Sequence, residues 1–141
     1  MNLIMKAFVA AHTFAIHASG GKFGGTMGGQ KLLLLTTKGN KSGKMRTVPV
    51  MCFTDEGQQA VIASAGGSPV HPAWFKNLES DPNVTVELDG RRYAARAEIV
   101  TGDRRARIWA EVTRLQPRFA DYEKTAQGRV IPVVVLKEAV S

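Results

Sequence analysis

Two apolar segments joined by a short turn lie in KLLLLTTKGNKSGKMRTVPVMCF, residues 31–53, and this stretch decides the fold. Residues 31–37 form a short apolar run that ends in threonine, which is typical of a buried strand. Residues 38–44 place two glycines among polar side chains, which indicates a tight turn. Residues 45–53 read as the returning strand, and Pro49 puts that strand at an edge of the sheet or at a bulge.

Outward from this hairpin, the chain shows more short strands and no regular alternation of strands with crossover helices. Strands are expected at residues 58–65, 83–88, 91–100 and 130–136. Helices are expected at residues 3–18, 72–80, 103–115 and 118–127. Asp89-Gly90 is a strong hairpin signal. About six antiparallel strands linked by hairpins close most economically as a small barrel, so the predicted class is mainly β (α+β) with flanking helices.

Composition excludes several classes of protein. The 141 residues, 44% of them apolar, suffice for one domain with a real core. Cys52 is the single cysteine, so it has no partner for an internal disulfide, and a cysteine-rich zinc site is excluded too. We expect no metal and a reducing, cytoplasmic compartment. No apolar run approaches the length of a membrane span.

The net charge of +7 is concentrated in the first third of the chain. Residues 1–54 hold seven Lys and Arg side chains and no Asp or Glu, whereas the remaining residues hold equal numbers of basic and acidic side chains. A one-sided basic face indicates an anionic partner, which is a phosphorylated small molecule, a nucleic acid or an acidic membrane surface. Composition does not choose among the three.

Residues 3–18 are rich in helix formers and apolar nearly all round. We expect a helix that packs on the barrel or lies on the inner face of the cell membrane. This helix, residues 1–19, would precede a single barrel domain at residues 20–141. Residues 20–29, GGKFGGTMGG, contain parts of a nucleotide-binding glycine pattern, but a strand-like run follows them, so they are interpreted as a flexible connector.

The turn at residues 38–44 and the start of the next strand gather four cations, Lys38, Lys41, Lys44 and Arg46. Lys41 and Arg46 can supply the charge-assisted hydrogen bonds that a phosphodiester or carboxylate needs. The alternative is a solvated hairpin whose lysines keep an edge strand soluble. This segment alone favours neither interpretation.

Two further segments indicate a pocket for a flat ligand. Residues 63–67, ASAGG, end an apolar strand with paired glycines, which let backbone approach a ligand closely. Residues 71–78, HPAWFKNL, add aromatic rings, a cation and an amide. No nucleophile and base pair can be named, and Cys52 lies among apolar neighbours as a structural thiol would. This favours chemistry that a bound cofactor carries.

Four segments carry a resemblance to a known family: LLLLTTKGNKSGKMRTVPV, ASAGG, HPAWFKNLESDPNVTVEL and RVIPVVVL. They resemble the deazaflavin (coenzyme F420)-dependent nitroreductase family of actinobacteria. Its members are related to FMN-binding pyridoxamine oxidase-like proteins, so the resemblance implies an FMN-binding-type split β-barrel. It also implies an F420-dependent reductase that transfers a hydride from reduced F420 to quinone, enone or nitroaromatic acceptors.

The resemblance assigns residues to each part of the site. The phosphate and anionic tail of F420 would contact Lys38, Asn40, Lys41, Ser42 and Arg46. Strand contacts with the deazaflavin ring would come from Thr47, Val48, Pro49, Val50, Met51, Ile62, Ala63, Ser64 and Ala65. Helix contacts would come from Ala73, Trp74, Phe75, Lys76 and Asn77. The acceptor pocket would be lined by Met51, Ser64, Phe119 and Tyr122.

Ser64 and Tyr122 are the predicted catalytic groups, because a hydroxyl donates to the oxygen that gains negative charge as hydride arrives. Three positions depart from the family pattern. Asn40 stands where the family often has Arg, and Ala65 where it often has Lys, so the tail site loses positive charge. Phe119 replaces a tyrosine of members that activate nitroimidazoles, which argues against that activity.

Alternatives from other classes remain. FMN also has an anionic tail and competes with F420 as the cofactor, and a non-catalytic carrier of a lipid or anionic cofactor fits the same fold. A nucleic-acid partner is not expected, because the basic turn lacks the interleaved aromatic residues of stacking platforms. The chain would act as a monomer or homodimer.

Overall fold

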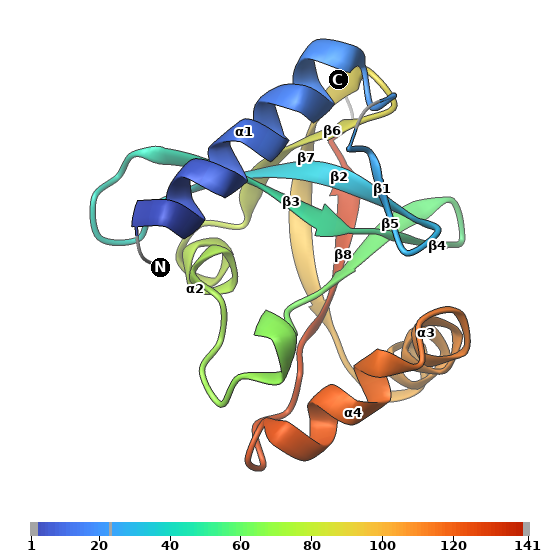
Figure 1. Ribbon diagram of the computed structural model, residues 1–141. Coiled ribbons are helices and arrows are strands. Elements are labelled where there is room, and N and C mark those ends of the chain that lie inside the picture. The colour runs from blue at the N-terminus through green and yellow to red at the C-terminus, as the bar shows by residue number, and fades with distance from the viewer. Residues whose placement is uncertain (1–2, 23, 140–141) are drawn as a thin grey trace.

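One curled sheet of eight antiparallel strands forms the body of the molecule (Figure 1). The computed structural model describes residues 3–22 and 24–139. The strands are β1 (Thr26–Met27), β2 (Gln30–Lys38), β3 (Met45–Met51), β4 (Phe53–Asp55), β5 (Gln58–Ile62), β6 (Asn83–Leu88), β7 (Arg91–Val100) and β8 (Val133–Glu138). Their order is β1-β2-β6-β7-β8-β5-β4, and β3 also pairs with β2.

The two ends of this sheet are joined by one continuous segment. β3 pairs with β2 at one end, and β4 pairs with β5 at the other. Only Cys52 separates β3 from β4, so the chain passes from one end of the sheet to the other at this residue. Such closure leaves few free strand edges. The expected barrel, mainly β with flanking helices, is confirmed.

β2 is buried on both faces. Leu33 and Leu35 belong to the core inside the barrel, whereas Leu32 and Leu34 pack on the opposite face with Ile16 of α1 (Leu3–Ser19). All four leucines are at most 5% exposed. A strand that is covered on both sides needs no polar alternation, which explains the continuous apolar run.

Three shorter helices complete the fold. α2 (Ala73–Ser80) contributes Phe75 and Leu78 to the barrel core. α3 (Gly102–Leu115) and α4 (Arg118–Thr125) lie together, away from α1 (Figure 1), and bury a second cluster against β8. A 3-10 turn, η1 (Ala65–Gly67), follows β5 and contacts α4. Trp74 of α2 and Tyr122 of α4 line one cavity together with Ser64, which immediately precedes η1.

The expected count of about six strands is wrong, because two very short strands were missed. β1 lies in the glycine-rich connector, and β4 is separate because the expected strand at 45–53 is divided at Cys52. The expected strand at 58–65 ends at Ile62, since Ala65 already has a positive φ. The last strand begins at Val133, after Pro132, rather than at residue 130.

α1 is attached to the barrel through its C-terminal half. Ile16 is buried on β2, His12 Nε2 donates to the Gly24 carbonyl (2.8 Å), and His17 Nδ1 lies 2.8 Å from Glu87 Oε1. Leu3, Ile4, Met5, Phe8 and Phe14 are exposed. Within residues 3–22 and 24–139, no helix is long and apolar enough to cross a membrane. Contact of α1 with a membrane surface stays a prediction.

Cys52 is expected to resist thiol reagents in the folded protein. Its side chain is 3% exposed, and burial raises the pKa of the thiol to about 11. At pH 8, reaction with Ellman's reagent should be about 100-fold slower in native than in urea-unfolded protein, because the thiolate is the reacting form. Equal rates in the two states would show that Cys52, between β3 and β4, becomes exposed readily in the native protein.

Candidate active site

A cavity of about 230 Å³ lies between β3, the loop that follows β5, and α4. It brings together the four side chains predicted for the acceptor pocket, Met51, Ser64, Phe119 and Tyr122. Its other lining residues are Met27, Val50, Ile62, Ala65, Gly66, Trp74 and Arg118. An engineered cavity of roughly 150 Å³ holds benzene. This cavity therefore has room for a ligand of one or two rings.

Two of the residues that line this cavity, Ser64 and Tyr122, carry hydroxyl groups. Within the described residues, neither the Ser64 nor the Tyr122 hydroxyl makes a hydrogen bond, and both residues line the cavity. The Tyr122 ring packs edge-on against Phe119, with ring centroids 5.3 Å apart. A ligand oxygen in the cavity can thus accept hydrogen bonds from these two hydroxyls without breaking a hydrogen bond of the described fold.

The loop that carries Ser64 is held from behind by Arg129. The guanidinium donates to the carbonyls of Ala63 (3.0 Å), Ser64 (2.7 Å) and Ser68 (2.8 and 2.9 Å). It also donates to His71 Nδ1 (2.9 Å), so that the His71 proton resides on Nε2. Burial, followed by the Arg129 charge, lowers the pKa of His71. Arg129 was not predicted, because a single arginine between loop residues carries no sequence signal.

A longer groove of about 560 Å³ lies between α1, β3 and α2. Its lining residues are Lys6, Val9, Ala10, Thr37, Met45, Arg46, Thr47, Val48, Ala73, Trp74 and Asn77. Six of the residues predicted to bind the cofactor from β3 and α2 are hence in reach of one ligand, namely Arg46, Thr47, Val48, Ala73, Trp74 and Asn77. Trp74 lines both the groove and the cavity, so the two hollows share this side chain in their walls.

β3 has backbone groups that no other described strand pairs, along its edge away from β2. Among the described strands it pairs only with β2. Every second pair of an antiparallel ladder exchanges hydrogen bonds, and Cys52 N–H donates to the Lys31 carbonyl (3.0 Å) at one end of this ladder. Counting from this bonded pair, Thr47, Pro49 and Met51 fall at the pairs that exchange no hydrogen bonds with β2. Thr47 and Met51 therefore direct both N–H and C=O away from β2, whereas Pro49 directs only its carbonyl. A planar ligand with polar groups along one side fits such an edge.

The basic turn is anchored by Asn77, which is 5% exposed. Asn77 Oδ1 accepts from Asn40 N–H (3.0 Å), and Asn77 Nδ2 donates to Thr37 Oγ1 (3.0 Å). The predicted cofactor contact of Asn77 therefore competes with a structural task. No ion pair among residues 3–22 and 24–139 involves the four cations at positions 38–46. Their charges are available to an anion.

Several predicted contacts do not line either hollow. Ala63 and Phe75 have their side chains in the barrel core, 0% and 3% exposed, so only their backbone atoms are left for a ligand. Neighbouring residues of a strand or helix point in different directions. Ile62 and Trp74 line the cavity, so the next residues, Ala63 and Phe75, point into the core. Pro49 and Lys76 line neither hollow, and the turn residues Lys38, Asn40, Lys41 and Ser42 lie outside both linings.

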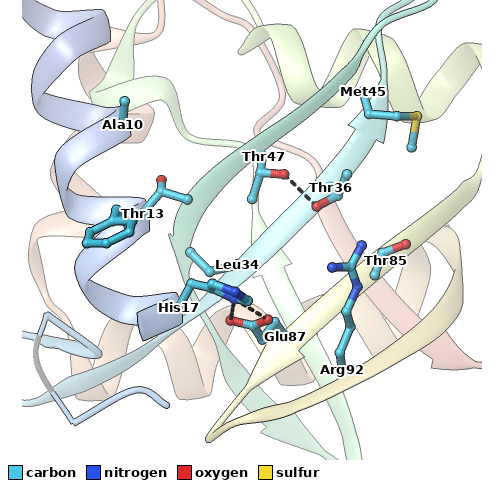
Figure 2. Close-up of a pocket in the computed structure, with 11 residues that line it drawn as sticks. Ala10, Thr13, His17, Leu34, Thr36, Met45, Thr47, Thr85, Glu87 and Arg92 are labelled. Carbon is cyan, nitrogen blue, oxygen red and sulfur yellow. Dashed lines mark hydrogen bonds and ion pairs between the residues drawn. The ribbon is translucent and has the colours of Figure 1, made fainter. Parts of the chain in front are cut away.

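A third hollow, of about 530 Å³, lies under the C-terminal half of α1 (Figure 2). Thr36 and Thr47 join β2 to β3 there through their hydroxyls (2.7 Å), and His17 faces Glu87. It shares Ala10, Met45 and Thr47 with the groove. Thr47 is the one residue of this lining that the resemblance assigned to the cofactor.

Comparisons with known proteins give the family. The family model described as F420H(2)-dependent quinone reductase matches residues 9–138. The chain belongs to this family. An F420H(2)-dependent quinone reductase of Mycobacterium tuberculosis is 34% identical to this family member over 107 residues, which are 74% of this chain and 71% of the relative.

Solved structures agree with this assignment. An F420-H2-dependent reductase, FDR-A, matches this quinone reductase family member with a TM-score of 0.68 at 34% identity, over 75% of this chain and 93% of the other. A second structure, described as a domain-swapped dimer, matches with a TM-score of 0.69 at 31% identity, over 94% and 98% of the two chains. The split-barrel fold is confirmed, and the protein is an oxidoreductase whose cofactor is coenzyme F420. The nitroreductase label is not confirmed, because the matching family is named for quinone reduction.

The groove fits F420 on two observations. The unpaired cations of the turn, together with Lys6 and Arg46 in the groove wall, suit a phosphate and carboxylates. The free edge of β3 at Thr47 and Met51 suits the alternating carbonyl and N–H groups of the deazaflavin ring. The losses of charge at Asn40 and Ala65 are partly offset, since Lys38, Lys41 and Lys44 remain on the same turn.

Proposed function

We propose that this quinone reductase family member holds F420 in the groove between α1, β3 and α2 and reduces a quinone in the adjoining cavity. The observation that carries this proposal is that Trp74 lines both hollows. A ligand in the groove and a ligand in the cavity would therefore both contact Trp74. Hydride transfer requires the reacting atoms to approach within about 3–3.5 Å, so we place the deazaflavin ring alongside Trp74, where it reaches the acceptor.

When bound, F420H2 supplies a hydride, and the chain supplies binding, orientation and stabilisation of charge. Arg46 and the turn lysines bind the anionic tail, and the β3 edge orients the ring. The Ser64 and Tyr122 hydroxyls donate to the acceptor oxygen as it becomes negative. Solvent then provides the proton that completes the hydroquinone.

Enones and nitroaromatic compounds are further candidate acceptors, because each also gains negative charge on oxygen. Phe119 offers no hydroxyl in the cavity wall and packs edge-on against Phe53, with ring centroids 6.0 Å apart. We therefore expect turnover in the order quinone, enone, nitroimidazole. Steady-state oxidation of F420H2 with menadione, cyclohexenone and a nitroimidazole measures this order.

Titration with F420 and with FMN tests the proposed binding site. F420 fluorescence should be quenched to saturation, and FMN should displace F420 only at much higher concentration. Tighter binding of FMN would favour the FMN-dependent alternative. Mass spectrometry of the purified protein tests the alternative of a non-catalytic carrier, because a bound acyl chain would support that alternative. The domain-swapped relative supports a homodimer, which light scattering measures.

Arg46→Ala should weaken F420 binding about tenfold, as expected for loss of a hydrogen bond between charged groups when the arginine is exposed. Arg46 lines the groove, whereas Lys137 is an exposed cation of β8 outside its lining. Lys137→Ala, with the same change of charge, is the control and should bind F420 as the wild type does. Equal affinities in the two variants would remove Arg46 from the tail site.

A further inference from the structure

All five N–H donors of Arg129 are hydrogen-bonded to residues 63–71, the segment that carries Ser64. A guanidinium has five N–H donors. Nε donates to Ser68 O, Nη1 to Ala63 O and His71 Nδ1, and Nη2 to Ser64 O and Ser68 O, at 2.7–3.0 Å. A lysine has three donors from one point and cannot reproduce this arrangement.

Two of these carbonyls belong to peptide groups at the cavity. The Ala63 carbonyl shares its peptide with the Ser64 N–H, and the Ser64 carbonyl shares its peptide with the Ala65 N–H. A trans peptide holds its N–H opposite to its C=O, so both N–H groups point away from Arg129. Ser64 and Ala65 line the cavity, and within the described residues neither N–H has a backbone or side-chain acceptor.

We propose that Arg129 is a positioning residue that holds and polarises the Ser64 and Ala65 N–H groups as donors to the acceptor oxygen. The inference rests on the proposed function, since it concerns the acceptor in the same cavity. A cation on the carbonyl side of a peptide strengthens its N–H as a donor, because hydrogen bonds in a chain polarise one another. Through these two peptide groups, the Arg129 charge stabilises negative charge on the acceptor oxygen.

The reaction places one negative charge where these donors point. F420H2 and quinone give F420 and hydroquinone. The hydride carries two electrons and one proton to the quinone, which leaves a hydroquinone monoanion, and the second proton arrives through solvent. Donors fixed beforehand toward the monoanion oxygen lower the barrier, because they need no rearrangement as charge develops.

Backbone geometry supports a held loop. Ala65 is a non-glycine residue with φ of 49°, and Gly66 and Gly67 follow with φ of 63° and 81°. Positive φ at alanine is unfavourable and persists only where the surroundings impose it. The bonds from Arg129 on one side and from Thr125 Oγ1 to the Gly67 carbonyl (2.8 Å) on the other impose it here.

The test compares Arg129→Ala and Arg129→Lys with Arg105→Ala. Arg105 also donates to a backbone carbonyl, that of Ile131 (2.7 Å), and it lies outside the lining of the cavity, so it is the matched control. Binding of 2,6-difluorophenol, followed by its fluorine NMR shift across pH, reports how strongly the cavity prefers phenolate to phenol. Amide proton shifts of Ser64 and Ala65 report the polarisation directly, and kcat with menadione reports catalysis.

Both Arg129 variants should lose phenolate preference and kcat by about tenfold, a part of the effect of removing one oxyanion donor, while F420 affinity and the Arg105→Ala values stay unchanged. Arg129→Lys keeps a cation and serves if Arg129→Ala does not fold. A folded Arg129 variant with wild-type phenolate preference, amide shifts and kcat overturns the inference. If the unchanged protein prefers phenolate to phenol but does not reduce quinones, the proposed function is contradicted instead.

Discussion

Ser64→Ala is expected to lower kcat for quinone reduction about 100-fold while leaving the Kd for F420 nearly unchanged, as for loss of one oxyanion donor. Ser64 lines the cavity, and among the described residues its hydroxyl has no hydrogen-bond partner to lose. Its removal should therefore cost little stability. Steady-state oxidation of F420H2 with menadione and with cyclohexenone measures kcat, beside a direct F420 titration.

Ser68→Ala is the matched control for this prediction. Ser68 lies on the same loop, but its hydroxyl accepts from Val70 N–H (3.1 Å) and does not line the cavity. Its kcat should stay within about twofold of wild type, since no interaction with the developing charge is lost. Tyr122→Phe should fall between the two, because it removes the second of the two proposed donors and keeps the ring that packs against Phe119. Wild-type kcat for Ser64→Ala on both acceptors would make Ser64 a loop residue only.

Gly67→Ala should destabilise the protein by about 2–4 kcal/mol, because strain and a clash act together. Gly67 has φ of 81°, and a Cβ there would lie 2.2 Å from Thr125 Oγ1 and 3.0 Å from Tyr122 Cα. The added methyl would push α4 and Tyr122 off the loop. Urea unfolding measures the loss, and we expect quinone turnover to fall with it.

Gly66→Ala separates strain from clash. Gly66 has φ of 63°, but a Cβ there meets nothing within 4 Å. It should cost about 1 kcal/mol, the range for placing a side chain in the left-handed region. Equal losses for the two variants would mean that α4 does not rest on Gly67 in solution.

Local patterns predicted the strands and turns well where one short stretch sets them. The Asp89-Gly90 signal is confirmed by a turn with φ of 52° and 80° at the two residues, as a type I′ hairpin requires. The hairpin of residues 31–53 was also predicted, except for the break at Cys52. At that break the chain passes between strands at opposite ends of the sheet, and no pattern in the neighbouring residues indicates it.

The candidate site was predicted in part. Met51, Ser64, Phe119 and Tyr122 come together as the resemblance implied, although they lie on separate elements. The role of Asn77 as an anchor of the basic turn and the five bonds of Arg129 were missed. Both depend on partners dozens of residues away, so they follow from the three-dimensional fold and not from spacing.

A single-turnover experiment tests the central claim most directly. Protein loaded with F420H2 is mixed with menadione, and the return of F420 absorbance is followed with the hydroquinone formed. We predict one F420 regained per hydroquinone, at a rate far above that without protein and strongly reduced in Ser64→Ala. Oxidation no faster than in the absence of protein, with F420H2 demonstrably bound, would contradict the assignment of this site to quinone reduction.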